Sequence, residues 1–345
     1  MTDTASSVRA GKVARVHDVD ALRGFALLGI FVVNITFMAS AYAGNLVDDP
    51  AYGSWLDEAA RFTVSALFSM KFYLLFSFLF GYSFTLQMGA AERAGAEFAP
   101  RMLRRILGLF VLGAAQIVLL YSGDVLTTYA LACLVLLAMF RVRDRIALRV
   151  AGIVYAVVLV SMTLSGLLVD RSAMLPSHAE ALANSAAQNQ AMLGSYADIV
   201  GQHFDGIWLL GVMALTMQGP TALAAFLLGM VAGRRQLLAN VTGTEPILRR
   251  IQMIGFPIGL LGAVAYAALG GEKGGMASVI SLATAPLLTA AYVATLLRAM
   301  HSRRFAWLRS ALAPAGRIAL TNYLLQALIG LLLFTGVGLG LAGQV

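Results

Sequence analysis

Charged residues are scarce in this sequence. Only 12% of its 345 residues are Asp, Glu, Lys or Arg, whereas 59% are hydrophobic. Soluble domains carry about 25% charged residues, so a water-soluble core does not account for this composition. The sequence therefore predicts an all-α integral membrane protein whose chain crosses the bilayer several times.

Cysteine and histidine are also scarce. The single cysteine, Cys133, excludes an internal disulfide. The four histidines, His17, His178, His203 and His301, are scattered along the chain and form no Cys/His cluster. The sequence therefore predicts no metal site.

Linkers rich in Pro or Ser and long internal repeats are absent, so no second domain is indicated. We expect a cytoplasmic N-terminal segment over residues 1–21 and a single transmembrane helical domain over 22–345. The basic N-terminus, the apolar run and Ala41-Tyr42-Ala43 are arranged as in a signal peptide. Cleavage is not expected, because the apolar run is long enough to span the bilayer.

Apolar runs of about 20 residues, the length that crosses a bilayer, recur along the chain. They predict a bundle of about nine transmembrane helices, near residues 22–44, 60–82, 102–121, 124–140, 149–169, 206–232, 251–270, 276–297 and 318–341.

Basic residues are distributed unevenly between the two sides of this arrangement. Of the 25 Lys and Arg residues, all but Arg61, Lys71, Arg171 and Lys273 fall on the side of the N-terminus. The positive-inside rule then predicts a cytoplasmic N-terminus and an external C-terminus. Membrane orientation also explains the net charge of +8 better than nucleic-acid binding does. The basic clusters lack the interleaved aromatic residues of a nucleic-acid surface.

The longest external connection, residues 170–205, has a composition that favours helix. It contains no Gly or Pro between Ser177 and Leu193. We expect either an external helix that caps the bundle or a partly ordered loop.

A charged triplet, Asp18, Asp20 and Arg23, precedes the first apolar run, which the amide of Asn34 interrupts. Arg23 and Asn34 are eleven residues apart, so they share a helix face and differ in depth by about 16 Å. This face is a candidate working surface.

Lys71 lies well inside the second predicted span, among Leu and Phe residues. A charge at the bilayer centre costs about 3 kcal/mol, so Lys71 needs a partner or a water-filled cavity. The amides of Asn34, Gln116, Gln218 and Gln326 lie at similar predicted depths. Together with Lys71 they indicate a hydrated chamber, although each amide can instead join two helices, a contact worth about 0.6–2 kcal/mol.

Asp124 lies in the short external turn between the third and fourth spans. It is a candidate helix N-cap, general base or partner of Lys71. Pro220 lacks the N–H that would bond to Thr216, so it predicts a kink or break in the sixth span, and such breaks often border substrate cavities.

Arginines near the cytoplasmic ends of the spans can form a ring that binds phosphates, or can serve as topology signals. Arg23 and Arg317 are the first candidates, because each adjoins polar residues of its own span; Asn322 follows Arg317 on the last span. The other members of this ring are Arg101, Arg104, Arg105, Arg234 and Arg235.

Five motifs of this sequence resemble those of the bacterial YeiB family, in the same order along nearly the whole chain. They are Asp-x-Leu-Arg-Gly-x-Ala-Leu-Leu-Gly-Ile at 20–30 with Asn34, Lys-Phe-Tyr-x-Leu-Phe-Ser-Phe-Leu-Phe-Gly at 71–81, Ser-Gly-Asp-Val-Leu-x-x-Tyr-Ala at 122–130, Phe-Leu-Leu-Gly-Met-x-x-Gly-Arg at 226–234 and Gly-Arg-Ile-Ala-Leu-Thr-Asn-Tyr-Leu-Leu-Gln at 316–326.

The YeiB family looks related to the transmembrane acyltransferases, which include heparan-α-glucosaminide N-acetyltransferase and polysaccharide O-acyltransferases. The resemblance implies a bacterial cytoplasmic-membrane protein with an acyl-CoA donor entering from the cytoplasm. It also implies an external acceptor hydroxyl or amine, and it matches Arg23 to the arginine of the relatives' first-helix motif.

The sequence departs from these relatives at two positions. The O-acyltransferases have a histidine where this chain has Asn34, and YeiB-like sequences often have one near Gln116. The general base is therefore left open. Relatives also continue for one or two more helices, so we expect either a short member or a chain truncated at Val345.

Three functions remain open from the sequence. For an acyltransferase, Asp124 is the candidate base, Lys71 the oxyanion stabiliser, Asn34 and Gln116 further catalytic candidates, and Arg23, Arg317, Asn322, Arg104 and Arg234 the acyl-CoA site. A small-molecule or lipid transporter and a non-catalytic membrane partner are the alternatives. Membrane lipids are expected partners, and nucleic acid is not expected to bind. Homo-oligomerisation and the identity of the acceptor are left open.

Overall fold

The computed structural model describes residues 2–168, 175–239, 241 and 243–344, with the side chains of 2–16 left out. Asp170, Arg171, Val345 and the start of the predicted external loop therefore lie outside the described residues. Every regular element in the described part of the chain is a helix.

The first half of the chain contains α1 (Thr2–Ala39), α2 (Ala41–Gly44), α3 (Trp55–Leu67), α4 (Lys71–Arg93), α5 (Phe98–Leu119), α6 (Leu126–Ala138) and α7 (Asp144–Leu168). The second half contains α8 (His178–Leu193), α9 (Tyr196–Met213), the π-helix η2 (Ala214–Gln218), α10 (Gly219–Arg234), α11 (Glu245–Ala268), the 3₁₀-helix η3 (Gly271–Lys273), α12 (Gly275–Met300), α13 (Trp307–Arg317) and α14 (Ala319–Phe334).

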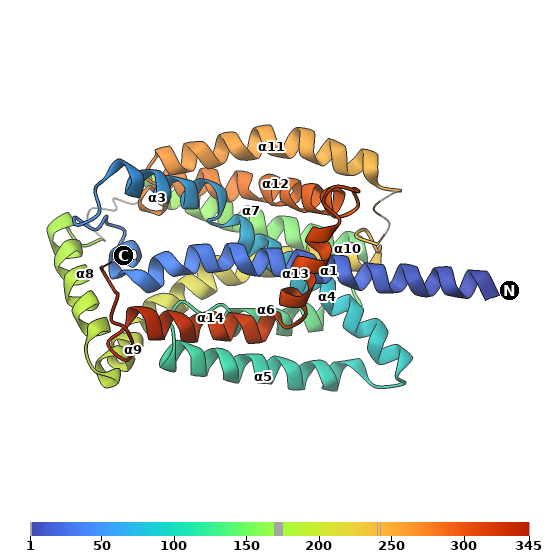
Figure 1. Ribbon diagram of the computed structural model, residues 1–345, viewed down its shortest axis with the longest axis horizontal. Helices are drawn as coiled ribbons and strands as arrows, with labels where there is room; N and C mark the ends of the chain where they lie inside the picture. Colours follow the sequence, from blue (N-terminus) through green and yellow to red (C-terminus); the bar gives the residue numbers. More distant parts are fainter. Residues whose placement is uncertain (1, 169–174, 240, 242, 345) are drawn as a thin grey trace.

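Most of the long helices run roughly alongside one another, and α8 crosses one end of the bundle (Figure 1). Seven apolar segments in the described residues are long enough to cross a membrane, and the bent pair α13–α14 would make an eighth. The protein is therefore an all-α membrane protein. The count of nine spans and the orientation of the termini remain predictions.

Two predicted spans have a form that hydropathy did not indicate. The run at 124–140 contains only the 13-residue α6. The last span is preceded by α13, and the two helices are bent by 76° at Ile318. The basic connections after α4, α6, α10 and α12 lie at the end of the bundle where α1 begins (Figure 1), as the predicted arrangement requires.

The centre of the bundle is the crossing of α4 and α10. A Cβ at Gly81 would lie 2.0 Å from the Phe226 carbonyl oxygen, and one at Gly229 would lie 2.0 Å from that of Phe78. Only glycine allows both backbones to approach so closely. Gly81 and Gly229, the glycines of the motifs that begin at Lys71 and at Phe226, therefore have a packing role.

Pro220 lies in the first turn of α10, directly after the π-helix η2. The segment Tyr196–Arg234 is long and apolar enough to form one span. Where the sequence predicted a kink or break, the helix therefore contains a π-helical segment, which accommodates the N–H that Pro220 lacks. The Thr221 hydroxyl donates to the carbonyls of Met217 and Gln218, which satisfies polar backbone groups at this point.

The helix α8 begins with a capping box between Ser177 and Glu180. This hydrogen bonding lowers the pKa of the Glu180 carboxyl. Asn189 accepts from the Ala41 N–H at 2.8 Å, and Gln188 accepts from Asn45 at 2.8 Å. The helix is therefore fixed across the end of α1 and α2.

Candidate functional site

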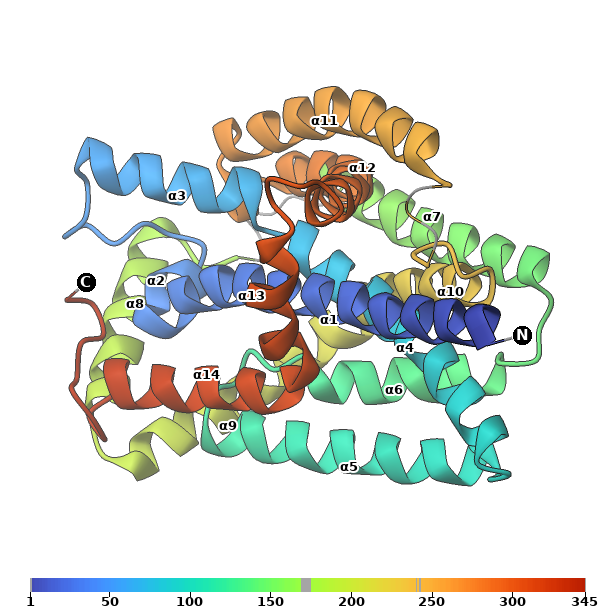
Figure 2. The same cartoon turned by 45° about the vertical axis from the view of Figure 1, so that its right-hand side comes forward.

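The middle of α1, around Asp20 and Gly24, packs tightly against α13. A Cβ at Gly24 would lie 2.2 Å from the Leu312 carbonyl oxygen, and one at Gly316 would lie 1.7 Å from that of Asp20. Figure 2 shows α13 crossing α1 at a steep angle. This crossing places Arg317, the residue after Gly316, near the part of α1 that carries Arg23.

Buried carboxylates hold this crossing in place. Asp20 accepts from Arg23 at 2.8 Å. Asp18 lies 2.8 Å from the Arg309 guanidinium and 2.9 Å from His301 Nε2. The charged triplet of the sequence is therefore divided: Asp18 joins α1 to α12 and α13, and Asp20 orients Arg23.

Arg23, Arg105 and Arg317 line a cavity of 560 Å³, which we call the basic cavity. Arg105 and Arg317 are exposed and Arg23 is partly buried, and Arg23 also donates to the Ser83 hydroxyl. The walls beyond them are mostly apolar; they include Ile30, Phe76, Leu79, Phe80, Leu109 and Leu112. The basic cavity thus offers cations beside an apolar lining, within the usual size range of small-molecule sites.

Tyr323, Val125 and Tyr129 also line the basic cavity. The Tyr323 hydroxyl donates to Asp124 at 3.3 Å, and the Asp124 carboxylate accepts from the Thr127 N–H at 3.1 Å. Asp124 thus accepts from the first turn of α6, although the N-cap position predicted for it is held by Val125, one residue later. It is also hydrogen-bonded to Tyr323, a residue of the cavity. The role of Asp124 as a general base stays a prediction.

Gln116 extends the cavity-lining face of α5, four residues beyond Leu112. It is only 1% exposed, and neither its amide nitrogen nor its oxygen makes a well-aligned hydrogen bond within the described residues. The amide still lies close enough to the Tyr323 hydroxyl to interact with it, in a geometry poorer than a regular hydrogen bond. A buried amide without a well-aligned partner can bind a ligand oxygen or a water molecule.

Of the two neighbouring arginines of α5, the structure brings Arg105 to the cavity, whereas Arg104 is exposed and does not line it. The helical periodicity explains the difference, because Arg105 shares a face with Gly108, Leu109 and Leu112. Sequence reasoning selected Arg104 because charge alone does not distinguish adjacent positions.

Arg234 and Asn322 have structural partners away from the cavity lining. Arg234 donates to the Val142 carbonyl at 2.7 Å and pairs with Asp144 at 3.2 Å, which fixes the turn between α6 and α7. Asn322 donates to the Ala315 carbonyl at 3.0 Å and so satisfies the end of α13 at the bend.

Lys71 is the first residue of α4 and is 1% exposed. Its ammonium donates to the Ser65 carbonyl at 3.1 Å and lies 5.4 Å from the centroid of the Tyr266 ring. Ser65 belongs to the last turn of α3, so Lys71 caps a helix C-terminus. None of the ion pairs between described residues joins Lys71 to Asp124.

Asn34 is half-buried on α1, between Ile30, which lines the basic cavity, and Ile35, which lines a second cavity. Its side chain makes no hydrogen bond to another described residue. Asn34 therefore separates two cavities along one helix.

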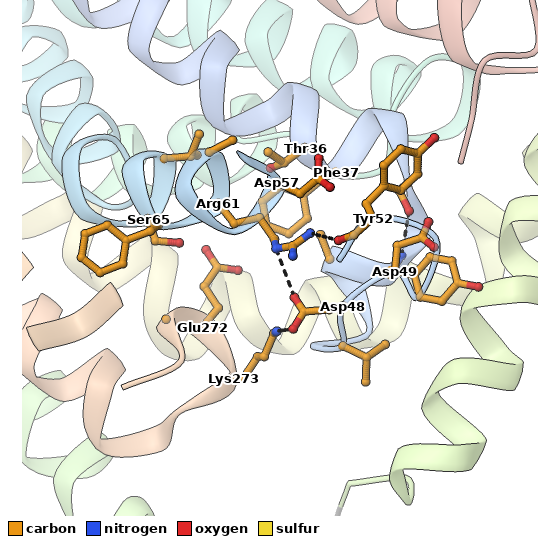
Figure 3. Close-up of a pocket in the computed structure, with 18 of the residues that line it drawn as sticks. Thr36, Phe37, Asp48, Asp49, Tyr52, Asp57, Arg61, Ser65, Glu272 and Lys273 are labelled. Carbon is orange, nitrogen blue, oxygen red and sulfur yellow. Dashed lines mark hydrogen bonds and ion pairs between the residues drawn. The ribbon is translucent and has the colours of Figure 1, made fainter. Parts of the chain in front are cut away.

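The second cavity, of 670 Å³, lies at the C-terminal end of α1, and we call it the acidic cavity. Figure 3 shows Asp48, Arg61 and Lys273 joined in one network, with Glu272 beside them. The surrounding protein removes water from the Glu272 carboxyl, and this desolvation raises its pKa above the usual range.

Sequence reasoning did not identify Tyr323, Tyr129 or Ser83 as lining residues. Tyr323 had a usable signal, because it stands in the Thr-Asn-Tyr motif one residue after Asn322. Tyr129 also had one, because it is the tyrosine of the motif at 122–130. Ser83 had none, since a serine is common in any membrane helix.

Residues 232–345 match a family described as "Protein of unknown function (DUF418)". Over 96% of its length the chain is 29% identical to "Uncharacterized protein YxaH" of Bacillus subtilis (strain 168), covering 84% of that protein. It is 37% identical to "Uncharacterized 39.9 kDa protein in amylase 3'region" of Bacillus acidopullulyticus, over 39% of this chain and 36% of that protein. No solved structure matches. The chain is therefore similar to uncharacterised proteins, and none of these names states an activity.

Proposed function

We propose that this protein is an acyltransferase of the bacterial cytoplasmic membrane, which binds an acyl-CoA in the basic cavity. The observation that carries the proposal is the cavity itself: three arginines, mostly apolar walls and the Tyr323–Asp124 hydrogen bond border one space. Guanidinium groups bind the phosphates of the donor, and the walls hold its acyl chain. A predicted cytoplasmic N-terminus would open this cavity toward the cytoplasmic pool of donor.

Tyr323 and Asp124 would together move the proton. The acceptor hydroxyl or amine attacks the thioester carbonyl, and its proton passes to the Tyr323 oxygen while Tyr323 gives its own proton to Asp124. The new bond to the acyl carbon forms, the carbon–sulfur bond breaks, and the departing thiolate takes the proton back from Asp124. Gln116, whose amide lacks a well-aligned partner, would donate to the carbonyl oxygen as negative charge develops there.

Lys71 and Arg234 are not needed for this reaction. The ammonium of Lys71 is directed to the end of α3, and Arg234 is held by the turn between α6 and α7. The proposal therefore rests on Arg23, Arg105 and Arg317 for binding and on Tyr323, Asp124 and Gln116 for chemistry.

Adjacent arginines of α5 allow a matched test of donor binding. Acyl-CoA affinity would be measured by calorimetry on the full chain in nanodiscs, for Arg105→Gln and Arg104→Gln. We expect about a tenfold loss for the first, the value of one charge-assisted hydrogen bond, and no change for the second. Equal effects of both, or no binding in either detergent or nanodiscs, would exclude the proposed donor site.

Tyr323→Phe separates chemistry from binding. The substitution keeps the aromatic ring and removes the hydroxyl, so acyl-CoA affinity should stay the same. Hydrolysis or transfer should fall about 10²- to 10⁴-fold, the usual contribution of a positioned acid or base. Unchanged turnover would remove Tyr323 and Asp124 from the reaction.

Transport is a second candidate, favoured by one observation. The two cavities border the same helix, at Ile30 and Ile35, which are about 7.5 Å apart along its axis. A carrier would move an amphiphile from one cavity to the other without covalent change. Proteoliposomes that accumulate intact acyl-CoA or lipid, with no product formed, would favour this function over acyl transfer.

A further inference from the structure

The acidic cavity carries more negative than positive charge. Five carboxylates line it, from Asp48, Asp49, Asp57, Glu58 and Glu272, against the two cations of Arg61 and Lys273. These groups come from the connection after α2, from α3 and from η3, so three separate segments converge on one space (Figure 3). The lining therefore has three uncompensated formal negative charges.

Some of these carboxylates already have partners. Asp48 pairs with Arg61 at 3.6 Å and with Lys273. The Asp57 carboxylate accepts from the Ser54 N–H at 3.0 Å and from its hydroxyl at 2.6 Å. Glu272 makes no ion pair or side-chain hydrogen bond to another described residue, although it lies beside this network. Its carboxylate is therefore available to a ligand.

A metal ion does not fit this lining. Within the described residues no three His, Cys, Asp or Glu side chains are grouped closely enough to hold one. The cavity volume of 670 Å³ also exceeds by far what a single ion occupies. Carboxylates spread over such a space match a larger cation.

Aromatic rings contribute to the same lining. Tyr42, Tyr52 and Phe37 border the cavity. The Tyr52 hydroxyl donates to the Gly343 carbonyl at 3.3 Å, which helps to fix its ring. Ring faces attract ammonium groups, and this attraction adds to that of the carboxylates.

We propose that the acidic cavity is a binding site for an organic ammonium compound, with Glu272 as the carboxylate that meets the ammonium group. This site is separate from the basic cavity and goes beyond the proposed acyl transfer. It would bind its ligand whether or not the basic cavity binds acyl-CoA.

The experiment measures binding of spermidine, a flexible triamine, to the full chain in detergent by calorimetry. We expect saturable binding that Glu272→Gln weakens about tenfold, because one charge-assisted contact is lost. Asp205→Asn is the matched control, since Asp205 is an exposed carboxylate of α9 that does not line the cavity. Thermal unfolding of each variant confirms that it is folded.

Three results would overturn the proposal. Absence of spermidine binding would do so directly. Equal weakening by Glu272→Gln and Asp205→Asn would show a general surface charge effect rather than a site. Displacement of spermidine by equimolar Mg²⁺ would show a metal site instead, whereas an uncharged polyol of similar length should not compete.

Free amines and lipid headgroups both carry an ammonium group. A second experiment distinguishes these two possible ligands. Spermidine affinity would be compared in nanodiscs of phosphatidylglycerol with and without phosphatidylethanolamine. Weaker binding with phosphatidylethanolamine, lost in Glu272→Gln, identifies the headgroup as a ligand. Equal binding in both identifies a soluble amine.

Discussion

Lys71 shows at the scale of one residue how a buried charge can have a structural role. Its ammonium satisfies the Ser65 carbonyl at the end of α3, and the Tyr292 hydroxyl donates to the Leu67 carbonyl at 3.1 Å in the same turn. Two side chains thus supply the donors that the interrupted helix lacks. The sequence predicted that the buried ammonium of Lys71 needs a partner or a water-filled cavity. The partner is a backbone carbonyl, which no sequence pattern identifies.

Substitutions of Lys71 should separate its charge from its volume. Lys71→Met removes a desolvated cation together with one hydrogen bond, so the melting temperature should change little. Lys71→Glu places a buried anion beside carbonyl oxygens and should destabilise the fold by about 3–5 kcal/mol. Thermal unfolding in detergent measures both. If Lys71→Met is as damaging as Lys71→Glu, the ammonium is required for folding.

Glu272 makes the proposed ammonium site sensitive to pH. Its pKa is raised because desolvation by the surrounding protein disfavours the charged carboxylate. As the pH is lowered through this raised pKa, Glu272 becomes protonated and loses its negative charge, so spermidine affinity should fall. This loss should occur at a higher pH than for an exposed glutamate with an ordinary pKa. Asp48, Arg61, Lys273 and Tyr266 surround this carboxyl and are unchanged in Glu272→Gln.

Calorimetry across a pH series on the wild-type chain and on Glu272→Gln tests this dependence. The variant should lack the step assigned to Glu272 and keep any step that belongs to the other carboxylates. An identical pH dependence in both proteins would assign the titration elsewhere.

At the scale of elements, hydropathy predicted where most helices lie, because a run of about 20 apolar residues has few alternatives in a bilayer. It did not predict α13. This helix of 11 residues carries Arg309 and Arg317 and was assigned to a basic connection. Leu308 and Leu312, four residues apart and both packed against the core, were the available signal.

The candidate site was also predictable only in part, because the missed helix α13 carries one of its arginines, Arg317. Arg23 and Arg317 stood out as charges next to polar positions of a span. Their convergence depends on the glycine contact between α1 and α13, which joins residues far apart in the sequence. A single sequence contains no information on such pairings beyond the presence of small residues.

Gly316→Ala tests the crossing of α1 and α13. The added methyl would lie 1.7 Å from the Asp20 carbonyl oxygen, so the helices must separate, at a cost of about 1–3 kcal/mol or more. We expect a lower melting temperature and weaker acyl-CoA binding, because Arg23 and Arg317 move apart. Gly152→Ala is the control, since a Cβ there meets nothing within 4 Å. Equal stability of the two variants would show that the close contact is not required.

At the scale of the whole molecule, the arrangement of charge predicts how the protein lies in the membrane. The basic connections are at one end of the bundle, and the acidic cavity is at the other. The positive-inside rule then predicts that the basic cavity faces the cytoplasm.

Single cysteines can check this orientation cleanly, because the native Cys133 is buried. In a Cys133→Ser background, Gly53→Cys should react with a membrane-impermeant maleimide added to intact cells. Ser302→Cys should react only after the membrane is opened, and both sites should react in detergent. The reverse pattern would invert the orientation and place the basic cavity outside.

The contact between Gly24 and the end of α13 also has a consequence for biosynthesis. A ribosome makes α1 well before α13, so the packing partner of Gly24 near Gly316 emerges only after α3 to α12 have been made. Until then Asp18 lacks the guanidinium of Arg309. The nascent protein must therefore keep this carboxylate hydrated or bound to a chaperone, and the wall shared by Arg23 and Arg317 is completed only after α13 has been made.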